Sequence, residues 1–195
     1  MMKKFSMLAA LVAVIAISGR LSAEEIEIGA QAPDFAAKAT DGQEVSLKGA
    51  LKDSKAVVLC FTCNKCPVSV AYEDRFIDFT KAYADKGVKF IAINVNKGEN
   101  LDVMKQRAEE KGFNFPYAFD ESGDSARGYG ARVTPHIFVV DAAGKVAYRG
   151  SFDDKQGDPT KHYVADAVDA VIAGKAPEVT STKAFGCGVS PNSKQ

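Results

Sequence analysis

The stretch AVVLCFTCNKCPVSV, residues 56–70, changes its character halfway along. Its first six residues, Ala56–Phe61, form a continuous apolar run of strand length, which is typical of a strand buried on both faces of a parallel sheet. From Pro67 to Lys86, apolar residues recur every three or four positions and a glycine follows, which predicts an amphipathic helix with a glycine stop. Cys63 and Cys66 therefore fall where a buried strand passes into a helix.

Strands and helices alternate on both sides of this junction. Before it, the turn dipeptide Asp41-Gly42 between short alternating segments predicts an N-terminal hairpin. The order predicts an α/β fold with a central mixed sheet flanked by helices and right-handed crossovers. The elements expected after the junction helix are a strand at 88–95, a helix at 101–111, a strand at 115–119, a short helix at 126–129, a strand at 136–140, a hairpin strand at 145–150 and a helix from about 160 to 173.

The first 23 residues are predicted to be a secretory signal peptide. Lys3 and Lys4 precede a short apolar run from Met7 to Ile17, and small residues lead to Ala23, after which we place the cleavage site. The apolar run is shorter than the about 20 residues that a membrane-spanning helix needs. We therefore expect an exported protein, either periplasmic or secreted.

The remainder of the 195-residue chain is expected to be one α/β domain, 24–176, followed by a C-terminal tail, 177–195. No later stretch is apolar enough to span a membrane. Basic and acidic residues number 25 each, and loss of the three basic residues of the signal peptide leaves a formal charge of −3. This balance, without a basic cluster, argues against nucleic acid and anionic membranes as partners. Four cysteines are too few for a disulfide-stapled scaffold, so a chemical role is expected.

The spacing of Cys63 and Cys66 predicts thiol chemistry. The carboxyl end of a sheet strand is where α/β proteins place their sites, and a helix N-terminus favours a thiolate over a thiol. The thiolate is the reactive species in disulfide exchange. Because C-x-x-C beside a βαβ pattern is typical of thiol redox proteins, we expect a redox-active disulfide in which Cys63 attacks and Cys66 resolves.

The other two cysteines allow different interpretations. Cys60 lies three residues before Cys63, so three cysteines could in principle hold an iron–sulfur cluster. However, Cys60 belongs to an extended strand and Cys66 to a helix, and we interpret Cys60 as a small buried hydrophobic residue. Cys187, in KAFGCGVS, is either an inert tail thiol, a third redox cysteine that reaches the Cys63–Cys66 pair, or a partner for another chain.

The chain resembles the thioredoxin-like superfamily, in its redoxin branch with the alkyl hydroperoxide reductase and thiol-specific antioxidant class. The motifs that carry the resemblance are GAQAPDF at 29–35, FTCNKCP at 61–67 and VTPHIFVVDAAGKVAYRG at 133–150. The resemblance implies a thioredoxin-like fold with a helix-strand insertion after residue 95. It also implies that Cys63 is the nucleophile and Cys66 its partner, that the bond before Pro135 is cis, and that the Thr134 backbone binds a substrate strand. No metal or organic cofactor is required.

Several departures from this pattern leave alternatives open. Thr62 stands where tryptophan usually precedes the first cysteine, and AVVLCF lacks the buried carboxylate of thioredoxin. A thiol-dependent peroxidase, similar to peroxiredoxins, is the main alternative, but no proline precedes either cysteine at that family's spacing. A copper-binding protein of this fold would use two cysteines and a histidine such as His136, but with three residues between the cysteines. The sequence thus predicts an exported thiol–disulfide oxidoreductase with protein thiols as substrates and a redox partner that recycles it.

Overall fold

The computed structural model describes residues 24–191. The predicted signal peptide, residues 1–23, lies outside the described residues, as do residues 192–195. The helices are α1 (Leu47–Leu51), α2 (Pro67–Tyr83) with a 3-10 turn at Ala84–Lys86, α3 (Leu101–Lys111), α4 (Asp124–Tyr129) and α5 (Tyr163–Ile172). The strands are β1 (Ala36–Ala39), β2 (Glu44–Ser46), β3 (Ala56–Phe61), β4 (Val88–Asn94), β5 (Tyr117–Phe119), β6 (Val133–Thr134), β7 (His136–Asp141), β8 (Val146–Gly150) and β9 (Cys187–Gly188).

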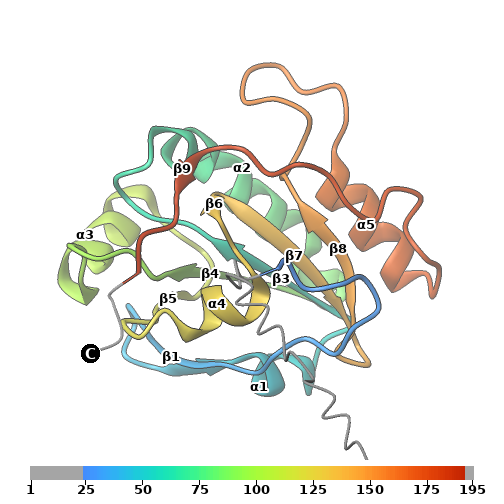
Figure 1. The fold of residues 1–195 in the computed structure, drawn as a ribbon, viewed down its shortest axis with the longest axis horizontal. Coiled ribbons are helices and arrows are strands. Elements are labelled where there is room, and N and C mark those ends of the chain that lie inside the picture. Colours follow the sequence, from blue (N-terminus) through green and yellow to red (C-terminus); the bar gives the residue numbers. More distant parts are fainter. Residues whose placement is uncertain (1–23, 192–195) are drawn as a thin grey trace, which may run out of the picture.

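A mixed seven-stranded sheet in the order β2-β1-β5-β4-β3-β7-β8 forms the centre of the molecule (Figure 1). β3 pairs in parallel with β4, and β4 with β5, whereas β7 and β8 complete the other edge in antiparallel pairing. β1 and β2 form the predicted N-terminal hairpin. The expected α/β fold with a flanked mixed sheet is therefore confirmed. Within the described part of the chain, no helix has the length and apolar character needed to cross a bilayer.

The core lies on both faces of the sheet, and β3 supplies residues to each. Val58 and Cys60 join the apolar cluster beneath α2 and α5, while Leu59 and Phe61 face the cluster beneath α1 and α4. Alternate residues of a strand point to opposite faces, so a wholly apolar strand is stable only when both faces are covered. Cys60 is fully buried, which confirms its interpretation as a core residue.

The differences from the sequence expectation include the starts of α5 and β5 and an additional strand in the tail. α5 begins at Tyr163 rather than near 160, because the Asp154 carboxylate accepts hydrogen bonds from the backbone N–H groups of Thr160 and Lys161 and holds them in the preceding loop. β5 begins only after Pro116, which has no N–H to donate to a sheet. The tail, which shows little periodicity, contains the short strand β9, and β9 pairs with β6 in a second sheet.

Candidate functional site

Both cysteines of the C-x-x-C motif lie at the end of β3, as predicted. Cys66 is the N-cap of α2: its backbone is extended, and its Sγ accepts a hydrogen bond from the Ser69 N–H at 3.4 Å. Pro67 takes the first helical position, where a missing N–H costs nothing. Cys63 lies in the preceding loop and is only 4% exposed, and Cys66 is 1% exposed. The helix N-terminus therefore acts on Cys66 more directly than on Cys63.

Thr134 contacts the sulfur atoms of both Cys63 and Cys66. Its Oγ1 is 3.5 Å from Cys63 Sγ, and its carbonyl oxygen accepts a hydrogen bond from Cys66 Sγ at 3.0 Å. The peptide bond between Thr134 and Pro135 is cis, as the resemblance implied. The structure thus brings together Cys63, Cys66, Thr134 and Pro135, the site residues expected from the sequence.

Cys187 also belongs to this site. β9 runs antiparallel to β6 and places Cys187 directly opposite Thr134. The Thr134 hydroxyl donates to the Cys187 carbonyl oxygen at 3.5 Å, and the Cys187 thiol is partly exposed. All four cysteines are free thiols in this structure. Three of them, one from the tail and two from the junction, therefore surround a single residue of the loop before the cis-proline.

The three thiols have different acidities. Burial raises the pKa of Cys63; a hydrogen bond from Thr134 offsets part of this effect, and the charge of Glu99 adds to it. Burial alone would also raise the pKa of Cys66, but hydrogen bonds from Cys187, Thr134 and the Ser69 backbone outweigh it and lower that pKa to about 7. The same hydrogen bond to Cys66 raises the pKa of Cys187 to about 11. Cys66 is therefore the most acidic of these three thiols.

Glu99 is a functional candidate that sequence reasoning missed. It is 7% exposed and follows β4, and its Oε2 accepts hydrogen bonds from the Asn64 N–H at 3.1 Å and from Asn94 Nδ2 at 3.0 Å. Its Oε1 has no hydrogen-bond partner among residues 24–191. The strand that precedes the cysteines contains no carboxylate. Glu99 comes instead from the loop after the neighbouring parallel strand β4, because the carboxyl ends of parallel strands meet at one edge of the sheet.

The residues between the cysteines are held by the insertion that contains α3 and β5. The Tyr117 hydroxyl donates to Asn64 Oδ1 at 2.8 Å, and Asn64 Nδ2 donates to the Val103 carbonyl at 3.3 Å. Lys65 Nζ donates to the Gly98 carbonyl at 2.7 Å. The lysine side chain is thus directed toward the loop after β4. The insertion fixes the shape of the turn between Cys63 and Cys66.

Replacing Glu99 by glutamine is expected to lower the pKa of Cys63. The substitution removes a nearby negative charge that disfavours the thiolate, and the amide oxygen can still accept the hydrogen bond from Asn64. Alkylation of Cys63 by iodoacetamide, followed by mass spectrometry as a function of pH, should show a midpoint at lower pH and a several-fold faster reaction at neutral pH. The exposed Glu109→Gln on α3 is the control; equal midpoints in the two variants would contradict the role of Glu99.

His136 begins β7 behind the cis-proline and is neutral at physiological pH. Burial, together with the positive charges of Arg149 and Arg132, lowers its pKa to about 4. Its Nδ1 accepts a hydrogen bond from the Arg132 N–H at 3.4 Å, and its ring packs against Phe138 at 4.6 Å between centroids. These contacts describe a packed, uncharged neighbour of the site. Among residues 24–191, no group of three His, Cys, Asp or Glu side chains is arranged to hold a metal ion.

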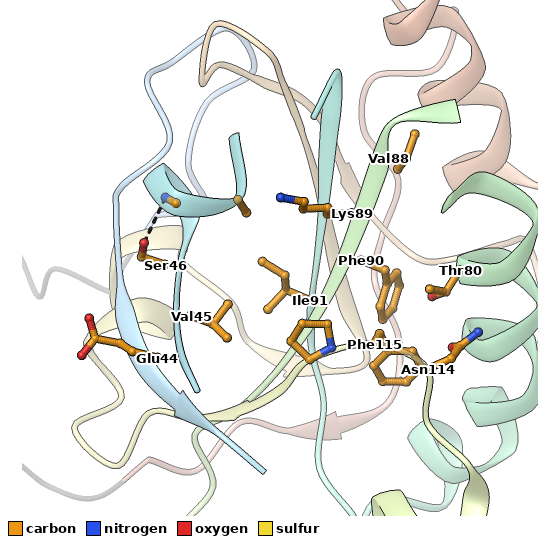
Figure 2. A pocket seen from close by; sticks show the side chains of 13 residues that line it. Glu44, Val45, Ser46, Thr80, Val88, Lys89, Phe90, Ile91, Asn114 and Phe115 are labelled. Atoms are coloured by element: carbon orange, nitrogen blue, oxygen red, sulfur yellow. Dashed lines mark hydrogen bonds between the residues drawn. The ribbon is translucent and has the colours of Figure 1, made fainter. Parts of the chain in front are cut away.

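A hollow of about 500 Å³ lies apart from the cysteines, near the start of β4 (Figure 2). Ile91, Phe90 and Phe115 give it a largely apolar wall, and Glu44 and Lys89 lie at its margin. The cysteines lie beyond the opposite end of β4, where Thr62 pairs with Ile93. The hollow is therefore not part of the thiol site.

Comparisons with known proteins agree with this geometry. The model of the AhpC/TSA family matches residues 28–149. The thiol-disulfide oxidoreductase ResA of Bacillus thuringiensis subsp. konkukian is 28% identical over 146 residues, which cover 73% of this chain and 78% of the relative. A hypothetical protein from Sinorhizobium meliloti 1021 has a similar structure, with a TM-score of 0.81 and 32% identity over 88% of this chain and 98% of that one. The thioredoxin domain of a thiol-disulfide oxidoreductase from Bacteroides vulgatus shares the fold, with a TM-score of 0.56 and 23% identity over 63% of this chain and 86% of that one.

Proposed function

Because the chain belongs to the AhpC/TSA family and is a thiol–disulfide oxidoreductase, we propose that it exchanges disulfides with protein thiols through Cys63 and Cys66. The observation that carries the proposal is the position of Thr134, which contacts both sulfurs immediately before the cis-proline. A pair of sulfurs two residues apart can close into a disulfide within the turn. A substrate strand beside Thr134, in the place that β9 occupies in this structure, would present its own sulfur to that pair.

The reaction begins when the Cys63 thiolate attacks a substrate disulfide. One substrate sulfur leaves as a thiolate, and the other forms a mixed disulfide with Cys63. Cys66 then attacks Cys63 Sγ, which releases the reduced substrate and leaves the Cys63–Cys66 disulfide. The low pKa of Cys66 suits this second step, because a substantial fraction of this thiol is ionised at neutral pH. The same steps in reverse oxidise a dithiol substrate.

Glu99 is our candidate for the group that adjusts the acidity of Cys63. It is the buried carboxylate beside the loop, and its negative charge raises the pKa of the Cys63 thiol. One of its oxygens is free of hydrogen bonds within the described part of the chain.

We also propose that the protein works outside the cytoplasm, in the periplasm or as a secreted protein. The support is the sequence of residues 1–23, with its basic start, short apolar run and small residues before the cleavage site. A thiol pair in an oxidising compartment needs a dedicated partner to restore its redox state. We therefore include such a redox partner in the proposed cycle.

The order of the two cysteines can be tested by trapping the mixed disulfide. The Cys66→Ser variant, incubated with insulin, should accumulate a covalent adduct through Cys63, because the resolving thiolate is absent. A non-reducing gel and peptide mapping would show the adduct and its linkage. In the matched Cys63→Ser variant, little adduct should form through the deeper Cys66. An adduct that forms faster through Cys66 would reverse the assigned roles.

A further inference from the structure

The tail crosses the site and is attached to the domain on both sides of Cys187. Before it, the Thr182 N–H donates to the Arg149 carbonyl at 3.0 Å. After it, the Ser190 N–H donates to Asn96 Oδ1 at 2.7 Å, and the Ser190 carbonyl accepts from the Lys97 N–H at 2.8 Å. Figure 1 shows this segment, in red, passing from α5 over β6 toward the far side of the sheet. The tail is therefore a bridge across the cysteines with Cys187 in its middle.

β9 occupies the edge of β6, where the proposed substrate strand would pair. The register sets Cys187 opposite Thr134, and the Val189 N–H donates to the Arg132 carbonyl at 2.9 Å. Gly186 makes this approach sterically accessible. Its φ is +146°, and a Cβ at this position would collide with the Thr134 carbonyl oxygen. Only glycine suits both the conformation and the contact.

We propose that Cys187 is a third redox thiol, which takes over the disulfide from the Cys63–Cys66 pair while its strand stays docked on β6. The inference rests on the proposed Cys63–Cys66 cycle. The Cys187 thiolate attacks Cys66 Sγ, the Cys66–Cys187 bond forms, and the Cys63–Cys66 bond breaks. Cys63 leaves as a thiolate, which takes up a proton equivalent to the one that Cys187 lost. The chain neither gains nor loses electrons in this step.

The proposed transfer moves the disulfide to a more exposed sulfur. Cys63 and Cys66 are 4% and 1% exposed, whereas Cys187 is partly exposed. A redox partner that must attack a disulfide sulfur reaches Cys187 more easily than either buried sulfur. The transfer therefore carries the oxidised bond from the interior toward the surface and returns Cys63 to its thiol form.

The acidity of Cys187 changes in step with the state of the pair. In the dithiol form, its hydrogen bond to Cys66 is the largest cause that raises its pKa, and the charges of Cys66 and Cys63 add to the effect. These contributions disappear once Cys66 and Cys63 are joined, because a disulfide carries neither a charge nor a proton. Cys187 thus becomes a better nucleophile when its target bond exists.

The test is disulfide mapping of the mature chain. The protein is equilibrated with oxidised glutathione, quenched with acid, alkylated and digested. We expect a peptide that links Cys66 to Cys187, together with alkylated Cys63. Gly186→Ala should lower the yield of this linkage about tenfold, because the added methyl group displaces β9. Gly188→Ala is the matched control, since a Cβ there meets nothing within 4 Å, and its yield should equal that of the unmodified chain.

A map that contains only the Cys63–Cys66 bond, or a linkage of Cys187 to Cys63, would overturn the inference. Equal yields in the two glycine variants would do so as well, because the docked strand would then not be the cause. Two cysteine variants distinguish a failure of the Cys187 inference from a failure of the proposed Cys63–Cys66 function. Cys63→Ser, oxidised with glutathione disulfide, should convert fully to the Cys66–Cys187 bond, whereas the adduct of Cys66→Ser with insulin tests the Cys63 cycle by itself.

Discussion

Replacing Cys63 by serine is expected to reduce the catalysed rate of insulin disulfide reduction to that of dithiothreitol alone. A serine hydroxyl remains protonated at neutral pH and cannot form the mixed disulfide with which the proposed cycle begins. The turbidity of the released insulin B chain measures the rate. Circular dichroism would verify that the variant is folded, which is expected because the change replaces one sulfur atom by oxygen.

Cys60→Ala is the matched control for this loss. Cys60 lies three residues earlier, on β3, fully buried between Ala92 and Ile137 of the neighbouring strands. Its removal takes away a thiol without touching the site, so the rate should stay close to that of the unmodified protein. If Cys63→Ser kept that rate, or Cys60→Ala lost it, the assignment of the reacting pair would be wrong.

Arg107→Ala is expected to cost about 3 kcal/mol of the free energy of unfolding. Arg107, on α3, forms a two-pronged ion pair with Glu73 of α2, with Nε to Oε1 at 2.9 Å and Nη2 to Oε2 at 2.6 Å. The Glu73 side chain is only 6% exposed, so the variant would leave a buried carboxylate without its main partner. Lys111 Nζ, at 3.9 Å from Glu73 Oε2, compensates only in part. Urea denaturation of the variant and of the unmodified protein measures the difference in the free energy of unfolding.

Lys105→Ala on the same helix provides the comparison. Its pairing with Glu109 spans 3.9 Å, and the two side chains are 59% and 69% exposed. Exposed pairs of this kind contribute about 0.5 kcal/mol or less, because water and salt screen them. A loss in Arg107→Ala no greater than that of Lys105→Ala would contradict the importance of burial. The ion pair matters to function as well, because it joins α2, whose N-cap is Cys66, to the insertion that holds Asn64.

Much of the fold could be predicted because its signals are local. β3 is a continuous apolar run and β7 is apolar at its centre; α2 and α3 repeat apolar residues at helical spacing, and α3 ends directly before a glycine. The Asp41-Gly42 turn predicted the first hairpin for the same reason. The predicted starts of α5 and β5 differ from the observed ones. The side chain of Asp154 and the missing N–H of Pro116 act on single residues and leave no periodic pattern.

The sequence by itself determined the fold class, the strand-to-helix junction and the pair Cys63 and Cys66, because spacing and periodicity are properties of neighbouring residues. Only the tertiary structure decided which groups surround that pair. Parallel pairing of β3 with β4 brings Glu99 to the Cys63 loop, and hydrogen bonds from Cys187, Thr134 and the Ser69 backbone make Cys66 the more acidic thiol. β9 is too short to show a period, and it forms only because Gly186 lets the tail approach Thr134. Contacts between distant segments depend on the packed fold, so no local sequence pattern indicated that Cys187 would lie at the site.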